Sequence, residues 1–335
     1  MSKAITFAST DDELIELLGR DKLLDILRQM LLIRNFEVRA ESAYLQGKVG
    51  GFFHSYIGQE AIQTALLAAI GKKNWFITSY RCHALALLLG EEPNSLMAEL
   101  YGREAGNAKG RGGSMHFYSD RLLGGFGIVG GQIPIATGAA FSVKYRGVKN
   151  EIATCFFGEG AVPQGTFHES LNLAALWDLP CLYIIENNRW GMGTPVEKAV
   201  SVKEIAELKA PGYGINGYTI NGMDFFRCYA AFTAIYKQML KDSRPVLVEV
   251  ITSRFKGHSI SDPGAYRTKE ALKAEMEKDS ILYLQKVLEE KGLIDADLFK
   301  KMDKEQKEIA VNAMKYAEEC PWPDPATLEQ DVFAP

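Results

Sequence analysis

The sequence has no apolar run that approaches the roughly 20 residues needed to cross a bilayer, and residues 83–90 are far too short. Its start shows neither a basic segment before an apolar core nor an arginine-rich pattern, so we expect no signal or transit peptide. The five cysteines form an odd set without a CxxC pair, which favours reduced thiols. We therefore expect a cytoplasmic protein without a membrane partner.

Positive charge is also scarce. Lys and Arg number 38 against 42 Asp and Glu, for a formal net charge of −4, whereas nucleic-acid binding normally requires a basic surface. The sequence contains no GxxxxGK[ST] phosphate loop, internal repeat, low-complexity tract or linker. We therefore predict no nucleic-acid partner, and one domain over residues 1–335 with helical N- and C-terminal extensions.

Hydrophobic periodicity predicts helices towards both ends of the chain and short buried strands in its middle. Helical spacing is found over residues 10–18, 21–46, 59–70 and 166–179, and again after residue 268. Apolar runs predict strands over 152–157, 181–186 and 245–251, with a weaker one over 217–222. The glycine-rich stretch 102–131 predicts loops. The fold class is therefore α/β, with a mainly parallel sheet flanked by helices.

Polar residues end the two clearest predicted strands. The first stops at Gly158-Glu159-Gly160 and the second at Glu186-Asn187-Asn188. Because parallel neighbours present their carboxyl ends along one edge of the sheet, these residues can converge in space. Carboxylate, amide and carbonyl oxygens suit Mg²⁺, and the flanking glycines let backbone amides approach an anion. Of the two asparagines, Asn188 is the better metal-ligand candidate.

The segment Gly125–Gly130 (GFGIVG) fits the GxGxxG pattern of dinucleotide-binding proteins. We find no buried strand before it and no acidic partner for a ribose at the end of the next strand. On this ground the sequence argues against a dinucleotide fold.

Residues 158–194, GEGAVPQGTFHESLNLAALWDLPCLYIIENNRWGMGT, resemble the thiamine-diphosphate fingerprint, usually written as GDG with a later NN. Further matches follow in the order GFFHSYIGQEA (51–61), SYRCHA (79–84), KGRGGSMHFY (109–118), GFGIVGGQIP (125–134) and RFKGHSISDPGAYR (254–267). Together they resemble the alpha subunits of the decarboxylating component of 2-oxo acid dehydrogenase complexes, and pyruvate dehydrogenases most closely. The resemblance covers nearly the whole chain and implies a fold that binds the diphosphate half of thiamine diphosphate.

The resemblance implies a role for individual residues. The metal ligands would be Glu159, Asn188 and the backbone carbonyl of Trp190. Contacts to the diphosphate would come from Tyr80, Arg81, Gly160 and Ala161, and contacts to the aminopyrimidine ring from Gly127 and Val129. The substrate end would be formed by Phe52 and His54. The catalytic histidines would be His54 and His258, the latter beside the phosphates on a mobile loop.

The resemblance also implies the reaction and the partners. The cofactors would be thiamine diphosphate and Mg²⁺, and the reaction oxidative decarboxylation of pyruvate with acetyl transfer to a lipoyl group. The carboxylate that the aminopyrimidine ring requires is not identified in this chain; in the family it lies on a beta subunit. An α₂β₂ heterotetramer bound to a lipoyl acyltransferase core is therefore expected.

One position departs from the family pattern, which has Asp where this chain has Glu159. The longer side chain moves the carboxylate outward, and Mg²⁺ tolerates poor geometry badly. We expect the loop to adjust, because every other ligand position matches. The alternatives are an acetoin or branched-chain 2-oxo acid dehydrogenase subunit, and a catalytically degenerate binding paralogue.

Overall fold

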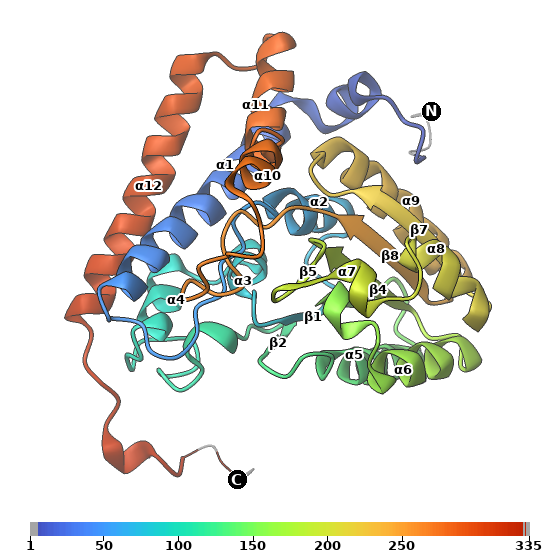
Figure 1. The fold of residues 1–335 in the computed structure, drawn as a ribbon, viewed down its shortest axis with the longest axis horizontal. Coiled ribbons are helices and arrows are strands. Elements are labelled where there is room, and N and C mark those ends of the chain that lie inside the picture. Colours follow the sequence, from blue (N-terminus) through green and yellow to red (C-terminus); the bar gives the residue numbers. More distant parts are fainter. Residues whose placement is uncertain (1–5, 331, 333–335) are drawn as a thin grey trace.

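A parallel sheet forms the centre of the protein. The structure, a computed structural model, describes residues 6–330 and 332. Six strands lie in the order β2-β1-β3-β4-β8-β7, and every neighbouring pair is parallel (Figure 1). Their bounds are β1 Trp75–Ser79, β2 Leu122–Phe126, β3 Ala153–Gly158, β4 Cys181–Asn187, β7 Asn216–Asn221 and β8 Val246–Ile251. The α/β class and the parallel sheet are confirmed.

Both faces of the sheet are covered by helices, so its central strands are apolar on both sides. Along β3, Phe156 faces one core cluster while its neighbours Cys155 and Phe157 face the other. The first face packs against α2 (Glu60–Ile70) and α9 (Phe225–Asp242). The opposite face packs against α5 Gln132–Tyr145, α6 Gly165–Leu176 and α8 Ile205–Lys209.

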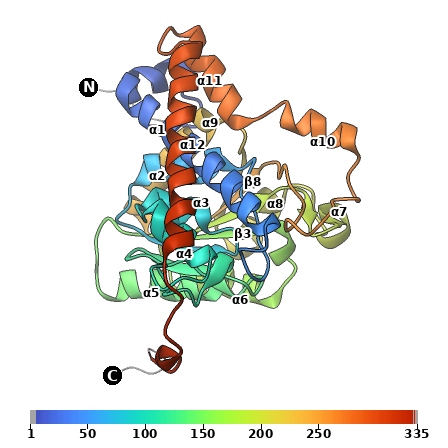
Figure 2. The same ribbon diagram turned by 90° about the vertical axis from the view of Figure 1, so that its left-hand side faces the viewer.

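Helices at both ends of the chain form a further layer. Helix α1 (Asp11–Leu45) begins with a capping box between Thr10 and Glu13 and bends at Gly19, whose φ is 72°. Gly19 is not helical, so the two helices predicted over 10–18 and 21–46 lie on either side of this break. Helix α12 (Ala296–Glu319) lies along α1 (Figure 2). The other helices are α3 His83–Leu89, α4 Pro93–Leu100, α7 Val196–Ala199, α10 Lys269–Met276 and α11 Ser280–Glu290, and a small antiparallel pair is formed by β5 Trp190–Gly191 and β6 Thr194–Pro195.

Two expectations about the region before residue 131 are wrong. The stretch 102–131 contains the edge strand β2, whose sequence LLGGF has too many glycines to predict a strand. Pairing with β1, which the sequence analysis also misses, holds it in the sheet. β2 leads into the GFGIVG segment, and α5 follows it. The prediction that no strand precedes this segment, which was used against a dinucleotide fold, is therefore wrong as well.

The strand order reverses at β1. The chain passes from β1 to β2 on one side and then to β3 on the other. In open parallel sheets such a reversal leaves a crevice at the carboxyl ends of the strands, where ligands bind. Within residues 6–330 and at 332, no helix is long and apolar enough to span a membrane.

Candidate functional site

A cavity of about 350 Å³ lies at this crevice. Loops after five strands contribute to its walls, so residues far apart in sequence meet there. The predicted residues on its walls are Tyr80 and Arg81 after β1, Val129 after β2, Glu159, Gly160 and Ala161 after β3, Asn188 and Trp190 after β4, and His258 after β8. The structure therefore brings together most of the predicted site.

Glu159 opens a single helical turn directly after β3, and its side chain is only 2% exposed. Its Oε1 atom has no hydrogen-bond partner among the described residues. Burial raises the pKa of this carboxyl to about 6, against the opposing effects of its own backbone amide and Arg254. A buried carboxylate oxygen without a partner is costly unless it ligates a cation. The longer side chain at this position still reaches the cavity.

The two asparagines after β4 have different surroundings. Asn187 is buried, and its Nδ2 donates to Glu249 Oε1 over 2.6 Å while its Oδ1 accepts from the backbone N–H of Arg189. Asn188 lines the cavity, and its Oδ1 accepts from the backbone N–H of Trp190 over 3.3 Å. Arg189 between them takes a left-handed conformation with φ of 70°. Of the pair, only Asn188 is placed to meet a ligand.

Arg81 joins two loops at the cavity. Its Nη1 donates to the carbonyl of Ser55 and its Nη2 to the carbonyl of His258, each over 2.6 Å. The centre of the Tyr80 ring lies 5.6 Å from the guanidinium carbon. Burial lowers the pKa of Arg81, although nearby acidic groups oppose the shift. A guanidinium has five N–H donors, so this one keeps donors for an anion in the cavity.

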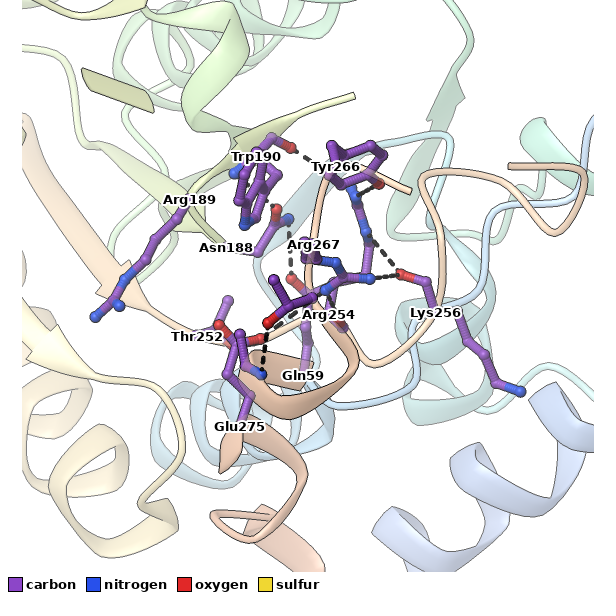
Figure 3. A network of polar contacts seen from close by, with 12 residues as sticks. Gln59, Asn188, Arg189, Trp190, Thr252, Arg254, Lys256, Tyr266, Arg267 and Glu275 are labelled. Atoms are coloured by element: carbon purple, nitrogen blue, oxygen red, sulfur yellow. Dashed lines mark hydrogen bonds and ion pairs between the residues drawn. The ribbon is translucent and has the colours of Figure 1, made fainter. Parts of the chain in front are cut away.

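Arg254, just beyond β8, is a site residue that the sequence analysis does not identify. It is fully buried, lines the cavity and donates to the carbonyls of Trp190 and Met192 over 3.5 and 3.4 Å (Figure 3). It also donates to the phenol oxygen of Tyr266 over 2.5 Å. Arg267 in turn donates to the carbonyl of Arg254. The segment 254–267, which resembles the family's sequences, contains both arginines. The hydrogen bond between them becomes visible only in the folded loop.

The predicted histidines lie close together. The ring centroids of His54 and His258 are 5.1 Å apart, and those of His54 and Tyr80 are 4.2 Å apart. The ring centroid of Phe52 lies 6.3 Å from that of His54; Phe52 is 61% exposed, and neither residue lines the cavity. Gly127 is also outside the cavity walls, where it lies against His116. The roles of all the predicted site residues stay predictions, including those of Phe52, His54, Gly127 and His258.

Both histidines are expected to remain neutral at physiological pH. Burial is the main cause and the positive charge of Arg81 the second, and together they lower the pKa of His54 to about 2 and of His258 to about 3. A lowered pKa means that the imidazolium form is disfavoured until the solution is strongly acidic. Histidine ¹⁵N spectra recorded from about pH 5 to pH 8 should therefore show no titration of either ring. Titration of either ring near its ordinary value would contradict this.

The residues present fit a divalent cation with an anionic diphosphate. Glu159, Asn188 and the carbonyl of Trp190 offer hard oxygen ligands of the kind Mg²⁺ prefers, and the unpartnered Glu159 oxygen requires such a partner. Arg81, Tyr80 and the amides around Gly160 offer donors to phosphate oxygens. Further cavity residues, to which the sequence analysis gives no role, are Gln59, Gln132, Gln164, Glu186 and Arg254.

Comparison with known proteins agrees with this geometry. The model of the family described as "Dehydrogenase E1 component" matches residues 28–326. The pyruvate dehydrogenase E1 component subunit alpha of Rickettsia felis is 42% identical over 317 residues, covering 94% of this chain and 96% of the relative. The protein of that name from Rhizobium meliloti is 41% identical over 313 residues, covering 92% of this chain and 89% of the relative.

A plant relative matches over a similar span. The mitochondrial pyruvate dehydrogenase E1 component subunit alpha-1 of Arabidopsis thaliana is 40% identical over 317 residues, covering 93% of this chain and 80% of the relative. The resemblance seen in the sequence motifs is confirmed over nearly the full chain. This protein belongs to the dehydrogenase E1 component family.

Proposed function

We propose that this chain is the alpha subunit of a pyruvate dehydrogenase. With a beta subunit, it carries out the oxidative decarboxylation of pyruvate and passes the acetyl group to the lipoyl group of an acyltransferase core. The observation that carries the proposal is the cavity in which Glu159, Asn188 and Trp190 meet Arg81 at the strand ends. The names of the relatives support pyruvate as the substrate.

The site residues take the following roles in this proposal. Glu159, Asn188 and the Trp190 carbonyl ligate Mg²⁺, while Tyr80, Arg81, Gly160 and Ala161 bind the diphosphate. Gly127 and Val129 contact the aminopyrimidine ring, His258 lies beside the phosphates, and Phe52 and His54 contact substrate. Thiamine diphosphate, when bound, supplies the carbon nucleophile and the electron sink for decarboxylation.

The beta subunit is proposed to cover the outer side of α5. This helix is apolar over most of its circumference, which is typical of a buried helix, yet one of its faces is exposed. That face, here called the α5 stripe, consists of Pro134, Ile135, Gly138, Phe141 and Tyr145. Its helical spacing would fit a helix of the partner, and α5 begins beside the cavity at Gln132. We propose that the assembly is an α₂β₂ heterotetramer.

A substrate panel tests this function. The chain is co-expressed with a candidate beta chain, and the purified complex is assayed with a dye acceptor on pyruvate, branched 2-oxo acids and acetoin. We expect pyruvate to react fastest, and the chain without its partner to be inactive. Preference for acetoin or for a branched acid would identify one of the alternative dehydrogenases. Cofactor binding without any turnover would indicate a degenerate paralogue.

We also propose a cytoplasmic location, which the five unpaired cysteines support.

A further inference from the structure

Gln59 lies in a rigid turn at the start of α2. Its backbone N–H donates to the carbonyl of Tyr56 over 3.1 Å. Gly58 before it has φ of 102°, and a Cβ atom there would lie 2.3 Å from the carbonyl oxygen of Ser253. Glu60 after it accepts from the Gly58 N–H and pairs with Arg34. Since the neighbours on both sides are held, Gln59 has a defined place on the cavity wall.

The orientation of the Gln59 amide follows from a chain of hydrogen bonds. Asn188 Oδ1 accepts from the Trp190 N–H, so the NH₂ group of Asn188 is at the other end of its amide. That NH₂ group faces Gln59 and donates to its Oε1 over 3.5 Å (Figure 3). Gln59 must therefore present its oxygen to Asn188 and its own NH₂ group, Nε2, away from it.

This NH₂ group has no partner among the described residues, and the side chain of Gln59 is only 1% exposed. A buried donor without an acceptor is unfavourable, because it has lost its hydrogen bonds to water. Glu159 lines the same cavity and is the complementary case, because its Oε1 is an acceptor that finds no donor within the described part of the chain. The two atoms do not satisfy each other in this structure. Their needs are opposite: the carboxylate requires a cation, and the amide requires an acceptor oxygen.

A metal-bound diphosphate would supply both the cation for Glu159 and the acceptor oxygen for Gln59. We propose that Gln59 is a diphosphate-binding residue, whose Nε2 donates to an anionic oxygen of the diphosphate while its Oε1 holds the amide of Asn188. The assignment rests on the proposed function. Gln59 is not among the diphosphate contacts that the sequence motifs predict. It lies at the start of α2, a helix that contributes none of the predicted site residues.

Two substitutions separate direct binding from support of Asn188. Gln59→Glu keeps an acceptor for Asn188 but replaces the donor with a negatively charged oxygen. Gln59→Met has a similar length and offers neither group. The complex with the beta chain is titrated calorimetrically with Mg²⁺ and inorganic diphosphate, and separately with Mg²⁺ and thiamine diphosphate. The unfolding temperature of the ligand-free complex is measured in parallel. Gln63→Met is the matched control, because Gln63 is an equally buried amide one turn further along α2 that does not line the cavity.

We expect Gln59→Met to bind both probes about 10-fold more weakly, and Gln59→Glu about 100-fold, because hydrogen bonds to charged groups are strong and the new charge repels the anion. The ligand-free unfolding temperature of Gln59→Met should not fall, and Gln63→Met should bind like the native complex. Native-like binding by Gln59→Glu, or weaker binding by Gln59→Met that accompanies a lower unfolding temperature, would overturn the assignment. If the native complex binds neither probe, the proposed function fails first; native binding with unaffected variants overturns only the role of Gln59.

Discussion

Glu159→Ala is expected to lower Mg²⁺-dependent binding of thiamine diphosphate by more than about 100-fold, since it removes the only carboxylate among the proposed metal ligands. The unpartnered Glu159 oxygen in the cavity is the physical reason. Calorimetric titration of the complex with its beta chain measures the effect. Glu207→Ala on the exposed side of α8 is the matched control and should bind normally. Undiminished binding by Glu159→Ala would remove this residue from the metal site.

Two other substitutions at this position sharpen the test. Glu159→Gln should raise the unfolding temperature of the ligand-free complex while it weakens metal binding, because it replaces a buried charge by a neutral amide. Glu159→Asp restores the family's usual residue and should retain binding. Tight binding by the native complex would establish a working site. Binding by the Asp variant alone would mean that the natural chain is a degenerate member of the family.

Gly138→Leu is expected to prevent assembly with the beta chain without unfolding this chain. Gly138 is exposed in the middle of the α5 stripe, and a Cβ atom there would meet open space. Glycine inside a helix costs about 1 kcal/mol relative to alanine, so the substitution should leave the isolated chain as stable or more stable. A leucine side chain would instead occupy the space that a closely packed partner helix needs.

Co-purification and size-exclusion chromatography with light scattering measure this effect. We expect the native pair to elute as a heterotetramer and the Gly138→Leu pair as separate chains. Lys237→Leu adds the same side chain to an exposed position of α9, outside the α5 stripe, and should assemble normally. A heterotetramer formed by the Gly138→Leu pair at native yield would show that the partner does not cover this stripe.

The central strands and the convergence of Glu159 with Asn188 can be predicted from sequence because the signal is local. β3 and β4 are continuous apolar runs that end at polar residues, and their parallel register places Gly158 opposite Glu186. Two such neighbours necessarily present Glu159 and Asn188 at the same edge of the sheet.

The extent of the domain over residues 1–335 stays a prediction.

The strands β1 and β2 are the two that the sequence analysis misses, for different reasons. β1 (WFITS) has a local strand signal, because Trp, Phe, Ile and Thr favour strands, but it has only five residues. β2 contains two adjacent glycines and has no such signal, so its conformation depends on pairing with β1 in the sheet.

The polar contacts of the cavity depend most fully on the tertiary structure. Composition and strand patterns were enough to predict the class of fold, and the strand ends and motifs identified most of the residues that meet at the cavity. The roles of these residues stay predictions. That Asn187 supports Glu249 whereas Asn188 faces the cavity follows only from the folded chain. The same holds for Gln59 and Arg254, which reach the site from α2 and from beyond β8. Hydrogen bonds between distant segments have no periodic pattern in the sequence, because they form only once the sheet has brought those segments together.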